Sequence, residues 1–305
     1  MTDNRAPSHF IYLALLALFW GSAFMFVKIS LDSISPLTLS ASRIAIGAIV
    51  LTLITLKMGE KLPQDRGQWL LCAIIGIIGN VIPFFLLNWS IQFVDSSLAA
   101  ICMSLSPLFT ITLAHYMTHD EKFSANKLIG IIFGVLGVAS LFYGTMVEVA
   151  TSTTLLLALS GLLATAFFYA LAGVLVKRLK NKNPLSTSSA MLISAAVITI
   201  PLALIFETPW TLTPTAPAVY SVLILGVFAT GIAALILFHL THLAGATFVS
   251  YGTYLIPLVG MTAGYIWLNE PLTTTYLVSV SFIFTGIFLA EKRTKKPKLK
   301  PTNKK

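Results

Sequence analysis

Residues 10–30 read FIYLALLALFWGSAFMFVKIS, and this stretch decides the class of fold. It contains a single charged side chain, Lys28, close to its end. About 20 consecutive apolar residues are enough for an α-helix to cross a bilayer. The run is too long for the apolar core of a signal peptide, and it has a counterpart later in the chain. We therefore interpret it as a membrane-spanning helix that belongs to the fold.

Nine further apolar runs follow, separated by short loops. The ten runs together are 10–30, 36–57, 68–86, 97–117, 126–144, 154–176, 185–206, 217–238, 244–267 and 273–291. The chain of 305 residues is 56% hydrophobic and only 10% charged, whereas soluble domains carry roughly 25% charged residues. The sequence therefore predicts an all-α integral membrane protein with ten transmembrane helices.

The lysines and arginines fall on one side of this pattern when the N-terminus is placed in the cytoplasm. Of the 20 such residues, 18 then lie in cytoplasmic segments, none lies in an outer loop, and Lys28 and Arg43 lie inside helices. The 18 are Arg5, Lys57, Lys61, Arg66, Lys122, Lys127, Lys177, Arg178, Lys180, Lys182 and the eight after residue 291. Segments rich in Lys and Arg remain cytoplasmic, so we expect a multi-pass protein of an inner or plasma membrane with both termini in the cytoplasm.

The net charge of +9 comes from these loops and from the basic tail, residues 292–305. A tail of this kind is solvated near anionic lipid headgroups and here lacks interleaved aromatic residues. We therefore expect the lipid bilayer as a partner and no nucleic acid. The two cysteines, Cys72 and Cys102, lie inside apolar runs and are expected to be buried thiols, so no metal site and no cofactor is predicted.

The two halves of the chain match each other in order and spacing. Gly76 and Pro107 are 31 residues apart, as are Gly226 and Pro257. Three further matches keep the same order: Trp20 and Lys28 with Tyr169 and Lys177, Pro36-Leu37 with Pro184-Leu185, and Glu121 and Gly137 with Glu270 and Gly286. We interpret residues 10–144 and 154–291 as two copies of one five-helix repeat.

An odd number of helices in each repeat has a consequence for orientation. The second copy must cross the membrane in the opposite sense, so the sequence predicts two inverted five-helix repeats. Inverted repeats allow a transporter to expose one central site to either side in turn.

These residues resemble the drug/metabolite transporter superfamily, in its EamA-like branch of ten-helix carriers. The resemblance covers residues 10–291. Its residues are Phe19-Trp20-Gly21-Ser22, Lys28, Pro36, Arg43, Ser106-Pro107-Leu108-Phe109, Glu121, Gly130, Gly134 and Gly137, then Pro257-Leu258, Glu270 and Gly286. It implies two bundles around a central cavity and transport of small metabolites, often export of amino acids. The chain departs from internal symmetry where Tyr169 replaces Trp20 and Met191 replaces Arg43, so charge recognition would be asymmetric.

Arg43 is the sharpest candidate for substrate binding, because it lies roughly 10 Å from the outer helix end at about 1.5 Å per residue. A charge at that depth usually faces a cavity or a partner. It either binds a substrate carboxylate or phosphate, or it is held by helix carbonyls, Asp32 or Asp95. Lys28 lies nearer the surface and either reaches outward to Asp32 and headgroups or helps to close an outer gate.

Other residues could line a cavity, with helix packing as the alternative for each. Trp20 and Phe24 lie one turn apart near the middle of the first helix. Asn80 needs polar partners in a membrane, so it either bridges helices or faces the substrate. The full predicted substrate-binding set is Trp20, Ser22, Phe24, Arg43, Asn80, Tyr169, Ser250, Tyr251 and Tyr254.

A second set is predicted to be gating or structural: Lys28, Pro107, Glu121, Pro257 and Glu270. Prolines inside helices, which also include Pro83 and Pro201, should cause kinks. Glu121 and Glu270 either cap the helix that follows them or pair with cations at a gate. The glycines at 130, 134 and 137 allow close helix packing within the bundle or, alternatively, in a homodimer.

The function that this pattern predicts is secondary transport of a small organic molecule, most simply export of amino acids or related compounds. A quaternary-amine or multidrug exporter is an alternative within the same class. An intramembrane enzyme or lipid-processing protein is the alternative from another class, but the runs contain no His–carboxylate constellation. No P-loop pattern is present, so no ATP-driven mechanism is expected.

Overall fold

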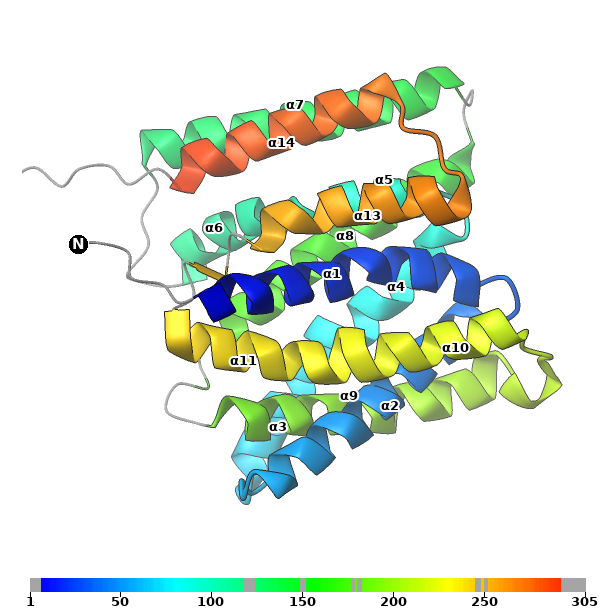
Figure 1. Cartoon of the computed structure of the whole chain (residues 1–305), viewed down its shortest axis with the longest axis vertical. Helices are drawn as coiled ribbons and strands as arrows, with labels where there is room; N and C mark the ends of the chain where they lie inside the picture. Colours follow the sequence, from blue (N-terminus) through cyan, green and yellow to red (C-terminus); the bar gives the residue numbers. More distant parts are fainter. Residues whose placement is uncertain are drawn as a thin grey trace, which may run out of the picture.

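The computed structural model describes residues 7–117, 124–148, 152–176, 179, 183–244, 248–249 and 252–291. These residues form a bundle of helices that run roughly parallel or antiparallel to one another (Figure 1). Each predicted run overlaps helical segments among the described residues, because long stretches of apolar side chains favour the internally hydrogen-bonded helix. Part of the run 244–267 lies outside the described residues.

The first half of the bundle extends to Glu148. Its elements are α1 (Pro7–Ser30), α2 (Pro36–Lys57), α3 (Arg66–Gly76), η1 (Ile77–Val81), α4 (Ile82–Ile91), α5 (Ser96–Met103), α6 (Ser106–Met117) and α7 (Ala125–Glu148).

The second half begins at Thr153. Its elements are α8 (Thr153–Val176), α9 (Pro184–Phe206), η3 (Pro209–Thr211), α10 (Ala216–Ile224), η4 (Leu225–Ile232), α11 (Ala233–Ala244), α13 (Gly252–Leu268) and α14 (Thr274–Glu291).

Seven helical stretches among the described residues are long and apolar enough to cross a membrane, and three shorter apolar helices accompany them. Three of the seven are built from consecutive elements: Arg66–Ile91, Ser96–Met117 and Ala216–Ala244. The protein is therefore a multi-pass, all-helical membrane protein. Residues 1–6 and the tail from 292 lie outside the described residues.

The helices are interrupted at some of the prolines. A π-helix, η1, ends just before Pro83, and Ser104 and Leu105 separate α5 from α6 at Pro107. By contrast, α9 and α13 continue through Pro201 and Pro257. A second π-helix, η4, has no proline within it. Such π segments leave backbone carbonyls without their usual partner, so they often lie at functional sites.

The pair of α7 and α14 packs side by side at one edge of the bundle (Figure 1). A Cβ atom at Gly130 would collide with the Gly286 carbonyl, and one at Gly137 would collide with Ile283. Ser140 and Ser279 share a hydrogen bond of 2.5 Å between the same helices. The glycines thus pack two helices of one chain together, which is the first of the two alternatives that the sequence leaves open.

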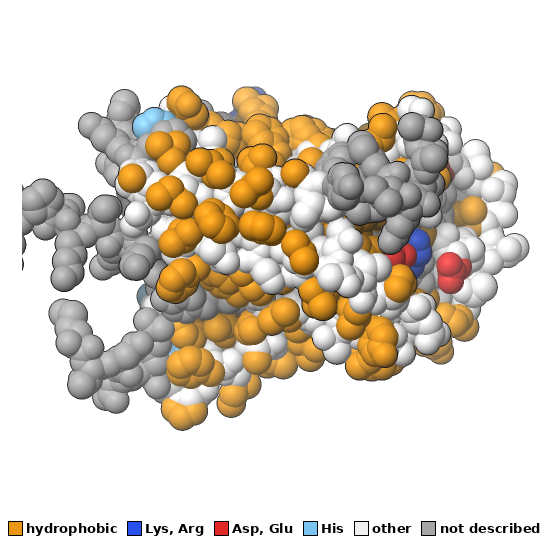
Figure 2. Space-filling view, turned by 90° about the horizontal axis from the view of Figure 1, so that it is seen from above, with side chains coloured by type: hydrophobic (Ala, Val, Ile, Leu, Met, Phe, Trp, Pro, Cys, Tyr) orange, Lys and Arg blue, Asp and Glu red, His pale blue; other side chains and the backbone are white. Residues whose placement is uncertain are grey.

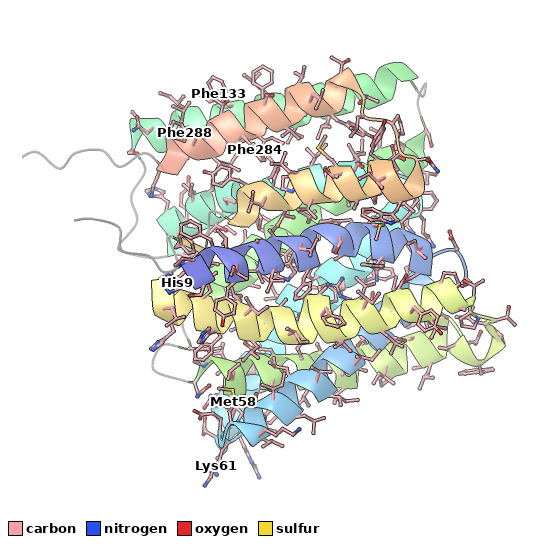
Figure 3. All side chains as sticks on the ribbon, viewed as in Figure 1. His9, Met58, Lys61, Phe133, Phe284 and Phe288 are labelled. Carbon is pink, nitrogen blue, oxygen red and sulfur yellow. The ribbon has the colours of Figure 1, made fainter. Side chains whose placement is uncertain are left out.

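Hydrophobic side chains cover most of the face seen in Figure 2, and the few charged side chains visible there gather toward one end. His9, Met58 and Lys61 lie at the opposite end (Figure 3). This distribution fits a molecule whose waist contacts lipid tails and whose ends contact water.

Candidate functional site

The π-helix η4 brings two of the predicted site residues together. The Nε1–H of Trp20 donates to the Ala229 carbonyl at 3.2 Å, and Nε–H of Arg43 donates to the Thr230 hydroxyl at 3.0 Å. Thr230 in turn donates to the Leu225 carbonyl, five residues earlier, at 2.9 Å. The π geometry therefore positions a hydroxyl and a carbonyl that α1 and α2 use as partners.

Arg43 is nearly enclosed, with 5% of its surface exposed. Its guanidinium carbon lies 4.1 Å above the ring centroid of Phe84 in α4, a cation–π contact. The ring of Tyr169 in α8 lies edge-on to the ring of Phe84, with centroids 6.3 Å apart. The site thus combines α2, α4, α8 and η4.

No carboxylate of the described residues pairs with Arg43. The expected partners lie elsewhere: Asp95 accepts a hydrogen bond from the Tyr276 hydroxyl at 3.0 Å, and Asp32 has no contact with Arg43. The two terminal nitrogens of Arg43 donate no hydrogen bond within the described part of the chain, and neither is fully enclosed. The cation is therefore held in place without being neutralised.

Two further polar groups near this cluster also lack hydrogen bonds among the described residues. One is the Tyr169 hydroxyl, and the other is the side-chain amide of Asn80, which is half-buried in η1. Asn80 lies four residues before Phe84, about one helical turn away. Among the described residues, the Asn80 side chain forms no hydrogen bond that would join two helices.

The other described members of the predicted set take ordinary helix positions. Ser22 donates to the carbonyl of Leu18 in its own helix at 2.6 Å. Phe24 is buried in the core, where it packs near Gly260 of α13. Tyr254 of α13 stacks edge-on against Phe284, which Figure 3 shows on the α13-facing side of α14, with centroids 5.6 Å apart. Ser250 and Tyr251 lie outside the described residues, as does Glu121.

Lys28 is tied to the end of a neighbouring helix. Its Nζ donates to the carbonyls of Ile91 and Val94 at 2.7 and 2.8 Å. These carbonyls follow the last turn of α4, where helix geometry leaves acceptors without partners. No hydrogen bond or ion pair joins Lys28 to Asp32 among the described residues, and the partners of Lys28 are backbone carbonyls.

Glu270 caps a helix, but not the one that follows it. Its carboxylate accepts from the backbone N–H groups of Ser96 and Ser97 at 2.7 and 2.9 Å, and from the Ser97 hydroxyl at 2.6 Å. Asn269 makes the turn that returns Glu270 to the bundle, in a left-handed conformation with φ 55° that Asn tolerates. The expectation of a local cap for Glu270 is corrected: it joins α13 to α5 across the two halves.

A second glutamate acts in the same way and was not predicted from the sequence. Glu207, at the end of α9, accepts from the backbone N–H groups of Leu37 and Thr38 at 3.0 and 2.6 Å. It also accepts from the hydroxyl of Ser35 at 2.6 Å. One sequence feature could have indicated both contacts. The start of a helix favours an anion, yet neither α2 nor α5 has an acidic residue in its first turn, and each has a serine at its start.

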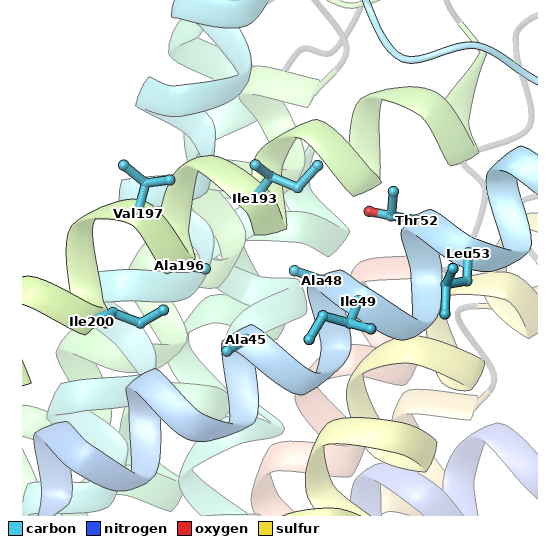
Figure 4. A pocket seen from close by; sticks show the side chains of 9 residues that line it. All are labelled: Ala45, Ala48, Ile49, Thr52, Leu53, Ile193, Ala196, Val197 and Ile200. Atoms are coloured by element: carbon cyan, nitrogen blue, oxygen red, sulfur yellow. The ribbon is translucent and has the colours of Figure 1, made fainter. Parts of the chain in front are cut away.

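Two hollows accompany these residues. One, of about 340 Å³, lies at the end marked by Glu270 and is lined by Lys28, Asp32, Asp95 and the turn from Leu268 to Pro271. The other, of about 450 Å³, is a groove between α2 and α9 that is lined by aliphatic side chains and by Thr52 (Figure 4). The groove does not include Arg43, and its lining is what a lipid-facing surface requires, so we place the site at Arg43.

Thr230 and Phe84 complete the Arg43 site but were absent from the predicted set. Thr230 corresponds to Asn80 when Gly226 is aligned with Gly76, an offset of 150 residues. That correspondence could have drawn attention to Thr230. Phe84 carried no signal, because a phenylalanine in an apolar run is indistinguishable from lipid-facing or core residues.

The described residues thus form a multi-pass helical bundle with a buried cation, Arg43, among its helices. The profile of the EamA-like transporter family matches the chain twice, over residues 8–143 and 156–291. The chain therefore belongs to the EamA-like transporter family, a family of transporters and not of enzymes.

Individual relatives agree with this assignment. The chain is 26% identical over 278 residues to an uncharacterized transporter, YoaV, of Bacillus subtilis, covering 90% of this chain and 93% of that one. It is 23% identical over 283 residues to a probable terminal-alkyne amino-acid exporter of Streptantibioticus cattleyicolor, covering 92% and 93%. An S-adenosylmethionine/S-adenosylhomocysteine transporter of Chlamydia trachomatis is 23% identical over 290 residues, covering 90% and 87%.

A protein of known crystal structure has the same fold. It matches with a TM-score of 0.69 and 16% sequence identity, covering 94% of this chain and 97% of the other. At this identity the likeness concerns the fold alone.

Proposed function

We propose that the protein is a secondary transporter of small organic metabolites, most simply an exporter of amino acids or related compounds. It would work by alternating access of two inverted five-helix repeats, residues 10–144 and 154–291, with ten crossings of a bacterial inner membrane. The observation that supports this proposal is a close contact between two helices that occurs twice. In the second contact the equivalent helices meet, with the two repeats exchanged.

The two crossings involve equivalent residues. A Cβ atom at Gly226 would collide with Ile46 and lie 3.3 Å from the Arg43 carbonyl, and one at Gly76 would collide with the Met191 carbonyl at 2.5 Å. Gly76 aligns with Gly226 and Arg43 aligns with Met191, so both contacts join the same positions with the repeats exchanged. Such exchange is the relation expected of a pseudo-twofold axis.

The π-helices also correspond. Residues 77–81 of η1 become 227–231 after the offset of 150, and these lie inside η4, Leu225–Ile232. Both π-helices thus fall at the same depth of equivalent helices. An irregular backbone at membrane depth is tolerated where it is buried or lines a cavity, which supports a central site between the halves.

At one end of the bundle, polar contacts join the two repeats. Glu270 holds Ser96 and Ser97, Glu207 holds the start of α2, and Ser33 accepts from the Thr215 N–H at 3.0 Å. With the N-terminus in the cytoplasm, this is the outer end. We infer that these contacts form the outer closure and that Glu270 acts in gating.

The charge of the site favours one kind of substrate within the class. Arg43 would repel a quaternary amine, and no acidic side chain lies beside it among the described residues. Zwitterionic or anionic metabolites are therefore favoured over cationic drugs. One relative is described as a probable amino-acid exporter, and this description agrees with the preference.

Efflux from proteoliposomes tests the proposal. The purified protein is reconstituted into liposomes that are loaded with labelled amino acids, and efflux is compared with that from protein-free liposomes. We expect saturable efflux of at least one amino acid without ATP. Chemical conversion of the solute without net movement would instead indicate an enzyme and would reject the proposal.

A further inference from the structure

We propose that Arg43 is the anchor for a carboxylate of the transported molecule, and that this molecule is a monocarboxylate such as an amino acid. The inference rests on the proposed transport function, because it assigns the chemistry of that central site. The observation that supports it is the state of the guanidinium, which is buried, held by a hydrogen bond on one side and without an anionic partner among the described residues.

The two cations inside the helices differ in a way that separates structural from binding roles. Lys28 is satisfied by two helix-end carbonyls. Within the described residues, Arg43 donates through its Nε–H alone, to Thr230, although a guanidinium has five N–H donors. Since a buried polar group without partners is costly, the unused donors of Arg43 indicate that a further partner binds there.

The geometry of Arg43 suits a two-oxygen acceptor. The Thr230 bond fixes the Nε edge of the planar group, and Phe84 covers one face at 4.1 Å. What remains available is the edge that carries the two terminal nitrogens. A carboxylate binds such an edge with two parallel hydrogen bonds, which are stronger than neutral ones.

The neighbouring groups fit the rest of such a ligand. Among the described residues, the hydroxyl of Tyr169 has no hydrogen bond and can contact a polar atom next to the carboxylate; Asn80, one turn before Phe84, has none either. The rings of Phe84 and Tyr169 provide an apolar wall. Because the described site has one cation and no carboxylate, a single negative charge on the ligand makes it neutral.

The fold itself does not require a cation at this place. Met191 occupies the equivalent position and makes the equivalent carbonyl contact, against Gly76. An apolar side chain therefore suffices for this helix crossing. The arginine in the other repeat is then retained for something other than packing.

Thermal unfolding of the purified full-length protein tests the anchor. The probes are L-phenylalanine, L-leucine and benzoate, each compared with its own amide. A ligand of the folded state raises the unfolding temperature with its concentration. We expect at least one acid to do so in wild type while its amide does not.

Two arginine variants are then compared. In Arg43→Met the acid-induced shift should require about tenfold more ligand or vanish, as expected for the loss of a charge-assisted bond. Arg66→Met is the matched control, since it removes an exposed arginine at the start of α3, and it should keep the wild-type response. If no acid stabilises the wild type, or if acid and amide act alike, the inference is overturned.

Folding and transport are kept separate from this readout. Should Arg43→Met fail to fold, two milder variants replace it. Arg43→Lys keeps the charge but lacks the planar fork, and Tyr169→Phe removes only a hydroxyl. We expect weaker acid binding in both variants, and unchanged binding in both would overturn the anchor. Flux reports on the proposed function independently. Movement of neutral solutes without acid binding would remove the anchor and keep the transporter, whereas acid binding without flux would do the reverse.

Discussion

At the scale of single residues, buried polar side chains are held by backbone groups that helix geometry leaves free. Lys28 donates hydrogen bonds to carbonyls at the end of α4 and in the turn after it, and Trp20 donates to a carbonyl in a π-helix. Asn88, fully buried, donates to the Pro36 carbonyl and to Ser40 at 3.2 and 2.9 Å. Because lipid offers no hydrogen bonds, each of these contacts satisfies groups that would otherwise be costly to bury.

Lys28→Met tests this structural role. The change leaves the carbonyl of Ile91 at the end of α4, and that of Val94 in the turn that follows, without the lysine donor. An unsatisfied buried group costs about 1–3 kcal/mol. We expect a lower free energy of unfolding, measured by denaturation in mixed micelles. Lys57→Met, an exposed lysine at the end of α2, should change stability by less than about 0.5 kcal/mol. Equal stability of the Lys28 variant and wild type would contradict the structural role.

The aromatic residues Trp20 and Tyr254 are predicted to line the transport path. Trp20→Ala and Tyr254→Ala should each reduce substrate flux while the amount of folded protein in the membrane stays near normal. Trp210→Ala and Tyr220→Ala are matched controls, since both side chains are largely exposed, and neither should reduce flux. If instead flux is lost in proportion to folded protein, the two residues pack the bundle, because large-to-small changes in a core cost about 3–5 kcal/mol.

At this scale, the sequence predicted which side chains make specific contacts better than it predicted the groups that they contact. Arg43 and Lys28 stand out because charges are rare within apolar runs, and the structure gives both buried, specific contacts. Their partners were mispredicted because the sequence reveals carboxylates but not free carbonyls or a cation–π face. Glu207 was missed because it ends a helix, where a charged residue needs no explanation.

At the scale of elements, helix starts at the proposed outer end are capped from the opposite half of the chain. Neither Ser35 nor Asp95, the residues just before α2 and α5, accepts a capping bond from its own helix. Glu207 and Glu270 supply the acceptors instead. A carboxylate at a helix start gains from the helix dipole, so each contact stabilises the helix and joins the halves at once.

Glu270→Gln tests whether this contact closes the outer end. Glutamine keeps the shape but loses the charge and one acceptor, so the hold on Ser96 and Ser97 should weaken. Cys102, buried in the same helix α5, then serves as the reporter. We expect an impermeant thiol reagent added from outside to label it several-fold faster in the variant, with Cys72 unchanged.

The control for that experiment is Glu60→Gln, which removes a carboxylate that makes no hydrogen bond among the described residues and lies near the end of α2. Labelling of Cys102 should then match wild type. Identical labelling of Cys102 in wild type and Glu270→Gln would show that the contact stabilises α5 without acting as a gate.

Element positions were predictable to within a few residues for most helices, because apolar length and starting prolines mark them. The run 36–57 coincides with α2. The π-helices could not be predicted, since neither η1 nor η4 has a composition that separates it from the α-helix around it. Their placement depends on packing against helices of the other half.

At the scale of the whole molecule, the prediction of two inverted repeats can be tested through topology. The repeats have five helices each, so the loop between them and the C-terminus should lie on opposite sides of the membrane. The charge pattern places the basic tail inside. A reporter enzyme active only outside the cytoplasm is therefore fused after residue 148 or after residue 305. We expect activity from the fusion at 148 and none from the fusion at 305.

This prediction depends on α7 and α14 being true membrane crossings. Their apolar described parts, Ala125–Leu141 and Thr274–Ala290, are among the shorter helices, and they pack on each other at the edge of the bundle. If the pair lay along one surface, each half would cross four times, and both fusions would remain in the cytoplasm and silent. Activity at residue 305 would reverse the assigned orientation. Only an active fusion at 148 with a silent one at 305 agrees with repeats that exchange roles across the membrane.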